Sequence, residues 1–262
     1  MIHGYWLKKL GIAGAYDLKD LTPEQYPDFL TRLAANGYVG GNVTVPHKEA
    51  AYRLVDDRDE AAAAVGAVNT VWLANGRLRG GNSDTHGFIA NLDDQAPGWE
   101  RGGGLAVILG AGGAARSAAY TLMKRGLRVA LVNRTLKRAE DLAAHYGPPV
   151  RAFGYDALPR LLAEAAVLVN CTSTGMVGKP RLEIDLGPLS PRAVVYDVVY
   201  VPLETDLLAM ARKHGNRTVD GLGMLLQQAG FGFEKWFGVM PTVTPELRAL
   251  VEEDIRAKTP KS

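Results

Sequence analysis

Leu109-Gly110-Ala111-Gly112-Gly113-Ala114-Ala115-Arg116 carries the clearest indication of the fold class in this chain. It follows a short apolar run, Leu105–Leu109, and it opens a predicted helix. Gly110 and Gly112 match the first two glycines of the dinucleotide fingerprint, and Ala115 occupies the third position, where alanine is allowed. Such a turn lets the backbone approach a pyrophosphate while the helix N-terminus directs free N–H groups at it. Because strand, turn and helix are all present, the stretch predicts dinucleotide binding rather than a plain tight turn.

The chain after this turn alternates between short apolar runs and helical segments. We predict strands at Val129–Val132, Val167–Asn170 and Ala193–Val198, and helices at Ala114–Arg125, Leu136–Tyr146 and Leu158–Ala165. This alternation is typical of a doubly wound parallel sheet, so the predicted fold class is α/β of the Rossmann type with a smaller α/β domain beside it.

The chain before the turn has its own elements, and a Gly-rich stretch at 97–104 indicates the join. We predict helices at Ile2–Leu10, Thr22–Gly37 and Lys48–Val65, a strand at Val39–Val45, and a hairpin of Val68–Leu73 and Arg77–Gly80 around Asn75-Gly76. Asn-Gly is the strongest short hairpin signal. We expect the tail, Thr259–Ser262, to be frayed.

Composition limits the possible functions. The 262 residues are 47% hydrophobic and carry a net charge of +2 without a basic run, so we expect neither a nucleic-acid partner nor membrane binding. No apolar run is long enough for a membrane span. Cys171 is the only cysteine, which excludes an internal disulfide and favours a reducing, cytoplasmic location. The histidines have no metal-ligand spacing.

The end of the next strand predicts which cofactor is bound. NAD-binding folds usually place a carboxylate there for the ribose 2′-hydroxyl, whereas this chain has Asn133 followed by Arg134. Arg134 and Arg138 are four residues apart, so on one helix they would share a face and could hold a 2′-phosphate. The alternative is a pair of solvated surface arginines. The sequence favours NADP.

Three polar clusters carry the remaining chemistry. They are Gly41–Lys48, Gly66–Thr70 and Gly80–Phe88. Together they supply a lysine for proton transfer, a carboxylate and several short hydrogen-bonding side chains, which suits a polyhydroxylated small molecule. Lys48 could instead be a surface lysine, and Asp84 a helix N-cap. The loop Asn170–Met176 could face a nicotinamide or could be a Ser/Thr-capped turn.

These motifs together resemble the shikimate dehydrogenase family. The resemblance runs through Asn42–Lys48, Gly66–Thr70, Asn82–Phe88, Gly110–Ala114, Asn133–Thr135, Asn170–Met176, Asp197–Pro202 and Asp220–Leu225. It implies an NADP-dependent oxidoreductase that reduces 3-dehydroshikimate in the chorismate pathway of aromatic amino-acid biosynthesis. It also implies a substrate domain of residues 1–84 and 222–262, an NADP-binding domain of residues 85–221, and a small-molecule substrate in the cleft.

The resemblance also implies roles for single residues. Lys48 corresponds to the catalytic lysine and Asp84 to its partner, while the other substrate-binding positions are Thr44, Asn69, Tyr200 and Gln228. The implied cofactor-binding positions are Gly110, Ala111, Gly112, Gly113, Ala114, Asn133, Arg134, Thr135, Arg138, Val198 and Gly221. Tyr200 and Gln228 could also be ordinary packing or capping residues. We expect His47 and His86 to be structural, and no metal site.

The chain departs from the family at its start. The family's Ser-x-Ser motif, which binds the substrate carboxylate, is missing before Met1-Ile2-His3. Either the natural protein is longer, or the chain is a truncated paralogue that acts as an NADP-binding or regulatory protein. A quinate/shikimate dehydrogenase that uses NAD is a third interpretation, which Arg134 and Arg138 disfavour. Monomer and homodimer both stay open.

Overall fold

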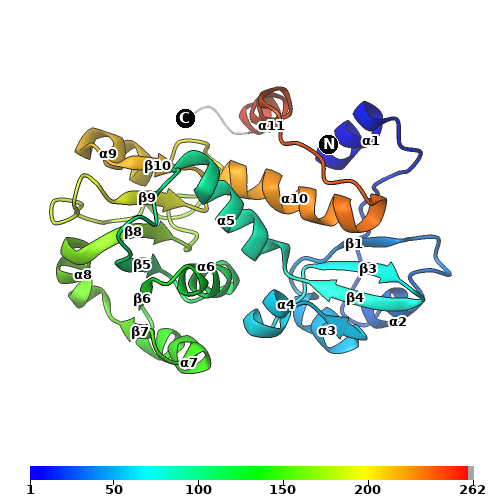
Figure 1. The fold of residues 1–262 in the computed structure, drawn as a ribbon, viewed down its shortest axis with the longest axis horizontal. Helices are drawn as coiled ribbons and strands as arrows, with labels where there is room; N and C mark the ends of the chain where they lie inside the picture. Colours follow the sequence, from blue (N-terminus) through cyan, green and yellow to red (C-terminus); the bar gives the residue numbers. More distant parts are fainter. Residues whose placement is uncertain (259–262) are drawn as a thin grey trace. The chain divides into compact units, whose positions relative to one another are not determined.

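The computed structural model describes residues 1–258, which form two compact units (Figure 1). The split unit comprises Met1–Gly87 and Leu226–Val251, and the central unit comprises Phe88–Leu225 with the chain from Glu252. The boundaries fall inside helices α5 (Ser83–Gln95), α10 (Gly221–Phe237) and α11 (Pro245–Lys258). The domain boundaries expected above, at residues 84/85 and 221/222, stay a prediction. The expected frayed tail, 259–262, lies outside the described residues.

The central unit is built on a six-stranded sheet in which every pairing is parallel. The order is β10-β9-β8-β5-β6-β7. The strands are β5 (Leu105–Leu109), β6 (Arg128–Val132), β7 (Val150–Phe153), β8 (Ala165–Asn170), β9 (Val194–Asp197) and β10 (Arg217–Val219). The prediction of a doubly wound α/β fold is confirmed.

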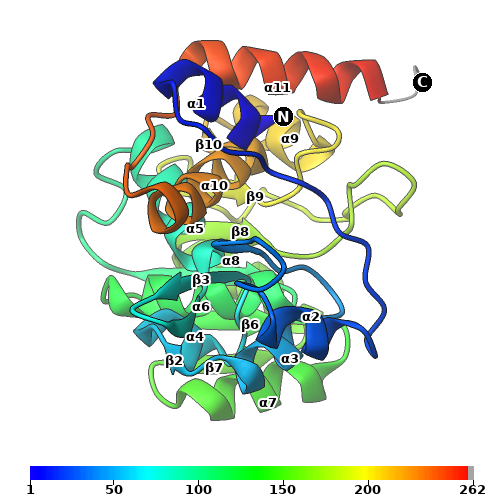
Figure 2. The same cartoon turned by 90° about the vertical axis from the view of Figure 1, so that its right-hand side faces the viewer.

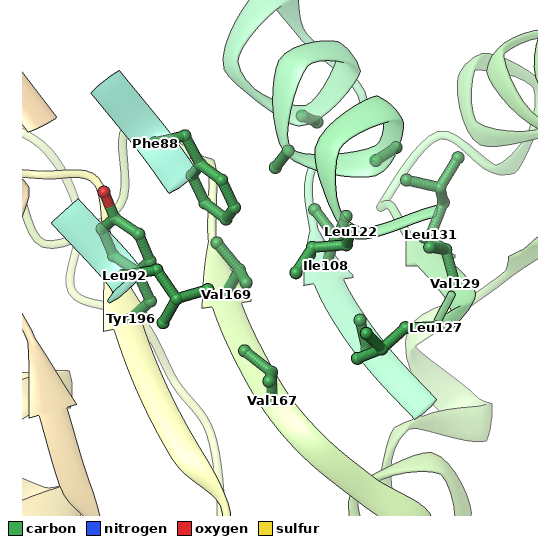
Figure 3. Close-up of a cluster of buried hydrophobic side chains, with 14 of the residues drawn as sticks. Phe88, Leu92, Ile108, Leu122, Leu127, Val129, Leu131, Val167, Val169 and Tyr196 are labelled. Carbon is green, nitrogen blue, oxygen red and sulfur yellow. The ribbon is translucent and has the colours of Figure 1, made fainter. Parts of the chain in front are cut away.

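Both faces of this sheet are buried, which explains why its strands read as continuous apolar runs. On one face, Ile108, Val169 and Tyr196 pack against α5, α6 (Gly113–Lys124) and α7 (Leu136–Tyr146), as Figure 3 shows for part of this cluster. Phe88 stacks on the Tyr196 ring with centroids 4.7 Å apart. On the other face, Val107 and Val195 pack against α8 (Leu158–Glu164) and α9 (Asp206–His214).

The split unit contains a four-stranded mixed sheet of order β1-β3-β4-β2. The strands are β1 (Gly40–Asn42), β2 (Asp57–Arg58), β3 (Thr70–Ala74) and β4 (Arg77–Gly81). The predicted hairpin is present, with positive φ at Asn75 (53°) and Gly76 (72°), the combination that a type I′ turn requires. Helices α2 (Tyr26–Thr31), α3 (Lys48–Leu54) and α4 (Glu60–Val65) bury a core that includes Val43 and Val71.

Helix α1 (Ile2–Leu10) packs against the C-terminal helices α10 and α11 within the split unit. The hydroxyl of Tyr5 donates to Glu246 Oε2 of α11 at 2.8 Å, and Figure 2 shows the two helices side by side. Trp6 packs edge-on against Phe233 of α10 with ring centroids 5.5 Å apart. No helix within residues 1–258 is long and apolar enough to cross a membrane.

Two predicted helices differ from the structure. The segment Lys48–Val65 is two helices separated by β2, because β2 pairs with β4 and Asp59 Oδ1 accepts the N–H of Ala62 at 2.6 Å to start α4. The helix expected from Thr22 is regular only over Tyr26–Thr31, with turns on either side. The predicted strand Val39–Val45 is likewise shorter, at Gly40–Asn42. The remaining element is a 3-10 turn at Tyr155–Ala157.

Candidate active site

Lys48 and Asp84 form an ion pair within the split unit. Lys48 is the first residue of α3, and Asp84 lies in the first turn of α5. Lys48 Nζ donates to Asp84 Oδ2 at 2.9 Å, and the side chains are 28% and 16% exposed. His47 anchors the turn before Lys48, because its Nε2 is 2.9 Å from the Leu21 carbonyl oxygen. The lysine is therefore held by a carboxylate but remains open to solvent or to a ligand.

The side chain of Asn69 is locked in one orientation beside this pair. Its Oδ1 accepts the Ser83 N–H at 2.7 Å, and the Ser83 and Thr70 hydroxyls lie within donating distance at 3.1 Å each. A flipped amide would place an NH₂ group against the Ser83 N–H, so the orientation is determined by its partners. Among residues 1–258, none accepts a hydrogen bond from Asn69 Nδ2. The amide nitrogen is a fixed donor.

The other proposed substrate residues lie in different settings. Thr44 is exposed in the turn after β1, where its carbonyl oxygen accepts the His47 N–H at 2.9 Å. Gln228 is half-buried in the part of α10 that belongs to the split unit. Tyr200 is half-buried in the central unit, three residues after β9 ends. Lys48, Asp84 and Asn69 are the members that the structure brings together.

The glycine turn between β5 and α6 is shaped for close approach to a ligand. Gly110 has φ 107°, and an added Cβ would lie 3.1 Å from the Cys171 carbonyl oxygen. At Gly112 and Gly113, an added Cβ would meet no atom of residues 1–258 within 4 Å. The first N–H groups of α6 have no partner within the helix, so this open space suits an anionic group such as a pyrophosphate. Ala111 and Ala114 flank the open positions, and both are half-buried.

Arg134 and Arg138 do not share a helix face, which corrects the expectation. Helix α7 begins at Leu136 after an N-cap at Thr135, so Arg134 precedes the helix and only Arg138 lies in its first turn. The turn is shaped by Asn133, whose Nδ2 donates to the Thr135 carbonyl oxygen at 2.8 Å.

Both arginines are nevertheless available to a ligand. They are exposed, and within residues 1–258 neither forms an ion pair. Lys137, which lies between them, pairs instead with Asp141 at 2.8 Å. Two uncompensated guanidinium groups therefore follow the end of β6, which suits an anionic group such as a 2′-phosphate.

Val198 and Gly221 meet at the ends of β9 and β10. A Cβ at Gly221 would lie 2.3 Å from the Val198 carbonyl oxygen, so packing alone requires glycine at this position. The Val198 N–H donates to the Asn170 carbonyl oxygen at 3.1 Å. The loop after Asn170 is a side-chain-capped turn, because Asn170 Oδ1 accepts the N–H and the hydroxyl of Thr172 at 3.0 and 2.7 Å.

Sequence reasoning missed the residues that hold the site residues in place. Ser83 and Thr70 orient Asn69, and a buried carboxylate, Asp197, joins three segments of the central unit. All three stand inside motifs quoted above. Their partners are set by the tertiary fold, so only their burial could have identified them.

Comparison with known proteins now gives the family. Residues 1–71 match the family described as "Shikimate dehydrogenase substrate binding domain", and residues 102–183 match "Shikimate / quinate 5-dehydrogenase". The shikimate dehydrogenase (NADP(+)) of Mesorhizobium japonicum is 55% identical over 258 residues, which cover 98% of this chain and 92% of that protein. The chain belongs to the shikimate dehydrogenase family.

Solved structures of family members share the fold. Shikimate 5-dehydrogenase from Thermus thermophilus in complex with NADP(H) and shikimate is 33% identical, with a TM-score of 0.83 over 98% of this chain and 92% of that chain. Quinate dehydrogenase from Corynebacterium glutamicum in complex with NAD is 30% identical, with a TM-score of 0.86 over 96% of this chain and 93% of that chain. The family thus includes proteins described with either cofactor, and the residues after β6 bear on that choice.

Proposed function

We propose that this protein catalyses the reversible NADP-dependent reduction of 3-dehydroshikimate to shikimate, a step of aromatic amino-acid biosynthesis. The observation that carries the proposal is the Lys48–Asp84 pair at 2.9 Å beside the fixed Asn69 donor, in a chain that is 55% identical to a shikimate dehydrogenase (NADP(+)). A lysine, a carboxylate and an amide donor provide the polar groups needed to hold a hydroxylated substrate and move its proton.

The central unit fits the cofactor. The open faces of Gly112 and Gly113 leave room for the pyrophosphate, and Arg134 and Arg138 are the groups that would bind the 2′-phosphate. When bound, the nicotinamide supplies the hydride that is exchanged with the substrate's ring carbon. The two unpaired arginines support NADP over NAD, although the fold itself accepts both cofactors.

Lys48 has the role of proton donor during reduction. Its ammonium group gives a proton to the substrate oxygen as the carbonyl becomes a hydroxyl, and its neutral amine takes that proton back during oxidation. Asp84 orients the lysine through their hydrogen bond. Asn69 donates to a substrate hydroxyl, while Thr44, Tyr200 and Gln228 contribute further contacts. On this proposal, residues 1–84 and 222–262 bind the substrate and residues 85–221 bind NADP.

A steady-state assay with four substrate and cofactor pairs tests the proposal. Shikimate or quinate is oxidised with NADP or NAD, and the absorbance of the reduced cofactor is followed. We expect the highest kcat/KM for shikimate with NADP. A protein that binds NADP but turns over none of the four pairs would support the alternative of a non-catalytic NADP-binding protein. A preference for quinate with NAD would contradict both the proposed substrate, shikimate, and the proposed cofactor, NADP.

The proposal also covers the cellular location and the oligomeric state of the protein. We place the protein in the cytoplasm, because its single cysteine, Cys171, suits a reducing compartment. It acts as a monomer or a homodimer, which light scattering during size-exclusion chromatography distinguishes.

A further inference from the structure

Asp197 is a buried carboxylate that the proposed chemistry does not use. It is the last residue of β9, and its side chain is 0% exposed. Oδ1 accepts from Asn170 Nδ2 at 2.9 Å and from the Val199 N–H at 3.1 Å, while Oδ2 accepts from the Thr205 hydroxyl at 2.7 Å. Removing a charge from water is costly, so a carboxylate in this position needs an explanation.

The first partner connects Asp197 to the loop after β8. Asn170 ends β8, and its amide is held between Asp197 and the loop. Its Oδ1 accepts from Thr172 N and Oγ1, and its Nδ2 also donates to the Thr174 carbonyl oxygen at 3.2 Å. The hydroxyls of Thr172 and Thr174 are hydrogen-bonded to each other. The Asn170 amide therefore links the loop to Asp197, because its oxygen is held by Thr172 while its nitrogen donates both to Thr174 and to the carboxylate.

The other partners connect Asp197 to two more segments. Val199 directly precedes Tyr200, a proposed substrate residue. Thr205 is the N-cap of α9, where its hydroxyl oxygen accepts the Leu208 N–H at 3.3 Å while its proton goes to Asp197. A carboxylate can accept from all of these donors at once, whereas an amide has only one accepting oxygen. The three segments lie at the carboxyl ends of parallel strands, the edge where open α/β sheets bind ligands.

We propose that Asp197 is a positioning residue for catalysis, which sets the loop Thr172–Thr174 and the backbone before Tyr200 in the arrangement that the nicotinamide and the substrate require. The inference rests on the proposed function. It distinguishes two halves of the cofactor site: the adenosine half, at Gly112, Gly113, Arg134 and Arg138, follows β5 and β6, and none of these four residues hydrogen-bonds to Asp197. The nicotinamide half depends on Asp197.

The variant Asp197→Asn tests this division. Asparagine has almost the same shape but replaces one accepting oxygen with a donor. We expect kcat for shikimate oxidation with NADP to fall by at least about 10-fold, because small misplacements of reacting groups can cost about 100-fold. The Kd of adenosine 2′,5′-bisphosphate, a probe of the adenosine half alone, should stay within about twofold of wild type, since the groups that hold it are unchanged.

Two variants of Thr205 keep the test decisive if Asp197→Asn does not fold. Thr205→Val removes the hydroxyl that donates to Asp197 and preserves the shape, while Thr205→Ser keeps the hydroxyl. We expect Thr205→Val to lower kcat several-fold with unchanged bisphosphate binding, and Thr205→Ser to retain most of the activity. Equal losses in the two variants would show that activity depends on packing at position 205 in general rather than on the hydroxyl, and would overturn the proposal.

The outcomes separate this inference from the proposed function. Wild-type protein without shikimate dehydrogenase activity would contradict the function itself. An active wild type together with a folded Asp197→Asn variant of equal kcat would contradict only the role of Asp197. A parallel loss of kcat and bisphosphate affinity would assign Asp197 a general structural role and would also overturn the inference.

Discussion

The backbone N–H of Ser83 donates to Asn69 Oδ1 at 2.7 Å, and Ser83 directly precedes Asp84. The hydrogen bond connects the start of α5 to the residue before β3, so the carboxylate that holds Lys48 and the amide of Asn69 belong to one hydrogen-bonded arrangement. Catalytic groups placed in this way need little reorganisation when a substrate arrives.

Replacing Lys48 tests the proton transfer. Lys48→Ala should lower kcat by about 100-fold or more, the usual contribution of general acid–base catalysis. KM for shikimate should change far less, because the lysine acts mainly in the transition state. Lys48→Arg is the sharper variant, since it keeps a cation beside Asp84 but does not release its proton. A Lys48→Arg enzyme with most of its kcat would refute the mechanism. Asp84→Asn, which keeps the shape, should also lower kcat strongly.

Because the amide of Asn69 is fixed, replacing Asn69 should raise KM for shikimate more than replacing Ser83. Asn69→Asp keeps the Oδ1 contacts with Ser83 but turns the free donor into an acceptor, so KM for shikimate should rise by about 10-fold or more. Ser83→Ala removes one donor to Oδ1 and leaves the backbone N–H, so KM should rise only about fivefold or less. Steady-state kinetics with saturating NADP give both values. A larger effect at Ser83 than at Asn69 would contradict the assignment.

Cofactor preference should depend on the arginines after β6. Losing Arg134 or Arg138 removes a hydrogen bond to a charged group, which corresponds to about a 10- to 150-fold weaker NADP affinity. NAD affinity should barely change. Lys137→Ala is the matched control, because Lys137 lies between the two arginines but pairs with Asp141. Calorimetric titration would show the difference. Equal affinities of the wild type for NAD and NADP would disprove the prediction.

Two glycines should respond in opposite ways to an added methyl group. Gly113→Ala places its Cβ in open space at the start of α6, so stability should be unchanged or rise by up to about 1 kcal/mol, while NADP binding weakens. Gly221→Ala places its Cβ 2.3 Å from the Val198 carbonyl oxygen and should lower the melting temperature. Thermal unfolding with and without NADP separates the two effects. A destabilised Gly113→Ala variant would mean that the glycine serves the fold.

Acidification should destabilise the split unit through His3. Burial lowers the pKa of His3 to about 4, although a hydrogen bond with Asn42 opposes the effect. The unfolded chain therefore binds more protons than the folded chain between about pH 6.5 and 4, and stability falls as the pH drops through this range, by up to about 3 kcal/mol. Urea unfolding of the wild type and of His3→Phe between pH 7 and 5 measures the difference. An NMR titration of His3 near pH 6.5 in the folded protein would contradict the prediction.

The sequence predicted the central unit better than the split unit, for a physical reason. The Gly110 turn and helix α7 carry local signals, and the predicted bounds of α7, Leu136–Tyr146, match the structure. The segment Lys48–Val65 has a strong helical composition, but Asp59 caps a second helix and β2 pairs with a distant strand. Helix propensity was overridden there by contacts that are not local.

In the candidate site, too, features with a local sequence signal were predicted and features that depend on distant contacts were not. The polar clusters indicated Lys48 and Asp84, and the family resemblance added Asn69. The structure pairs Lys48 with Asp84 and bonds Asn69 to Ser83, the residue before Asp84. The arginine pair was predicted on one helix face, but α7 begins at Leu136, after Arg134 and the N-cap Thr135. The role of Asp197 could not be predicted from the sequence, because its link to Asn170 on β8 forms only when the two strands pair in the folded sheet.

The split unit is made from both ends of the chain, which has a consequence for protein synthesis. Trp236 Nε1 donates to the Val71 carbonyl oxygen at 2.9 Å, and Trp6 Nε1 donates to that of Thr242 at 3.2 Å. On the ribosome, domains generally fold as units while the chain is still being made. The N-terminal segment must therefore wait, with its aromatic side chains uncovered, until residues 226–251 have been translated. The greater part of the central unit, Phe88–Leu225, can fold during that interval, so the segment that is made first is among the last to be covered.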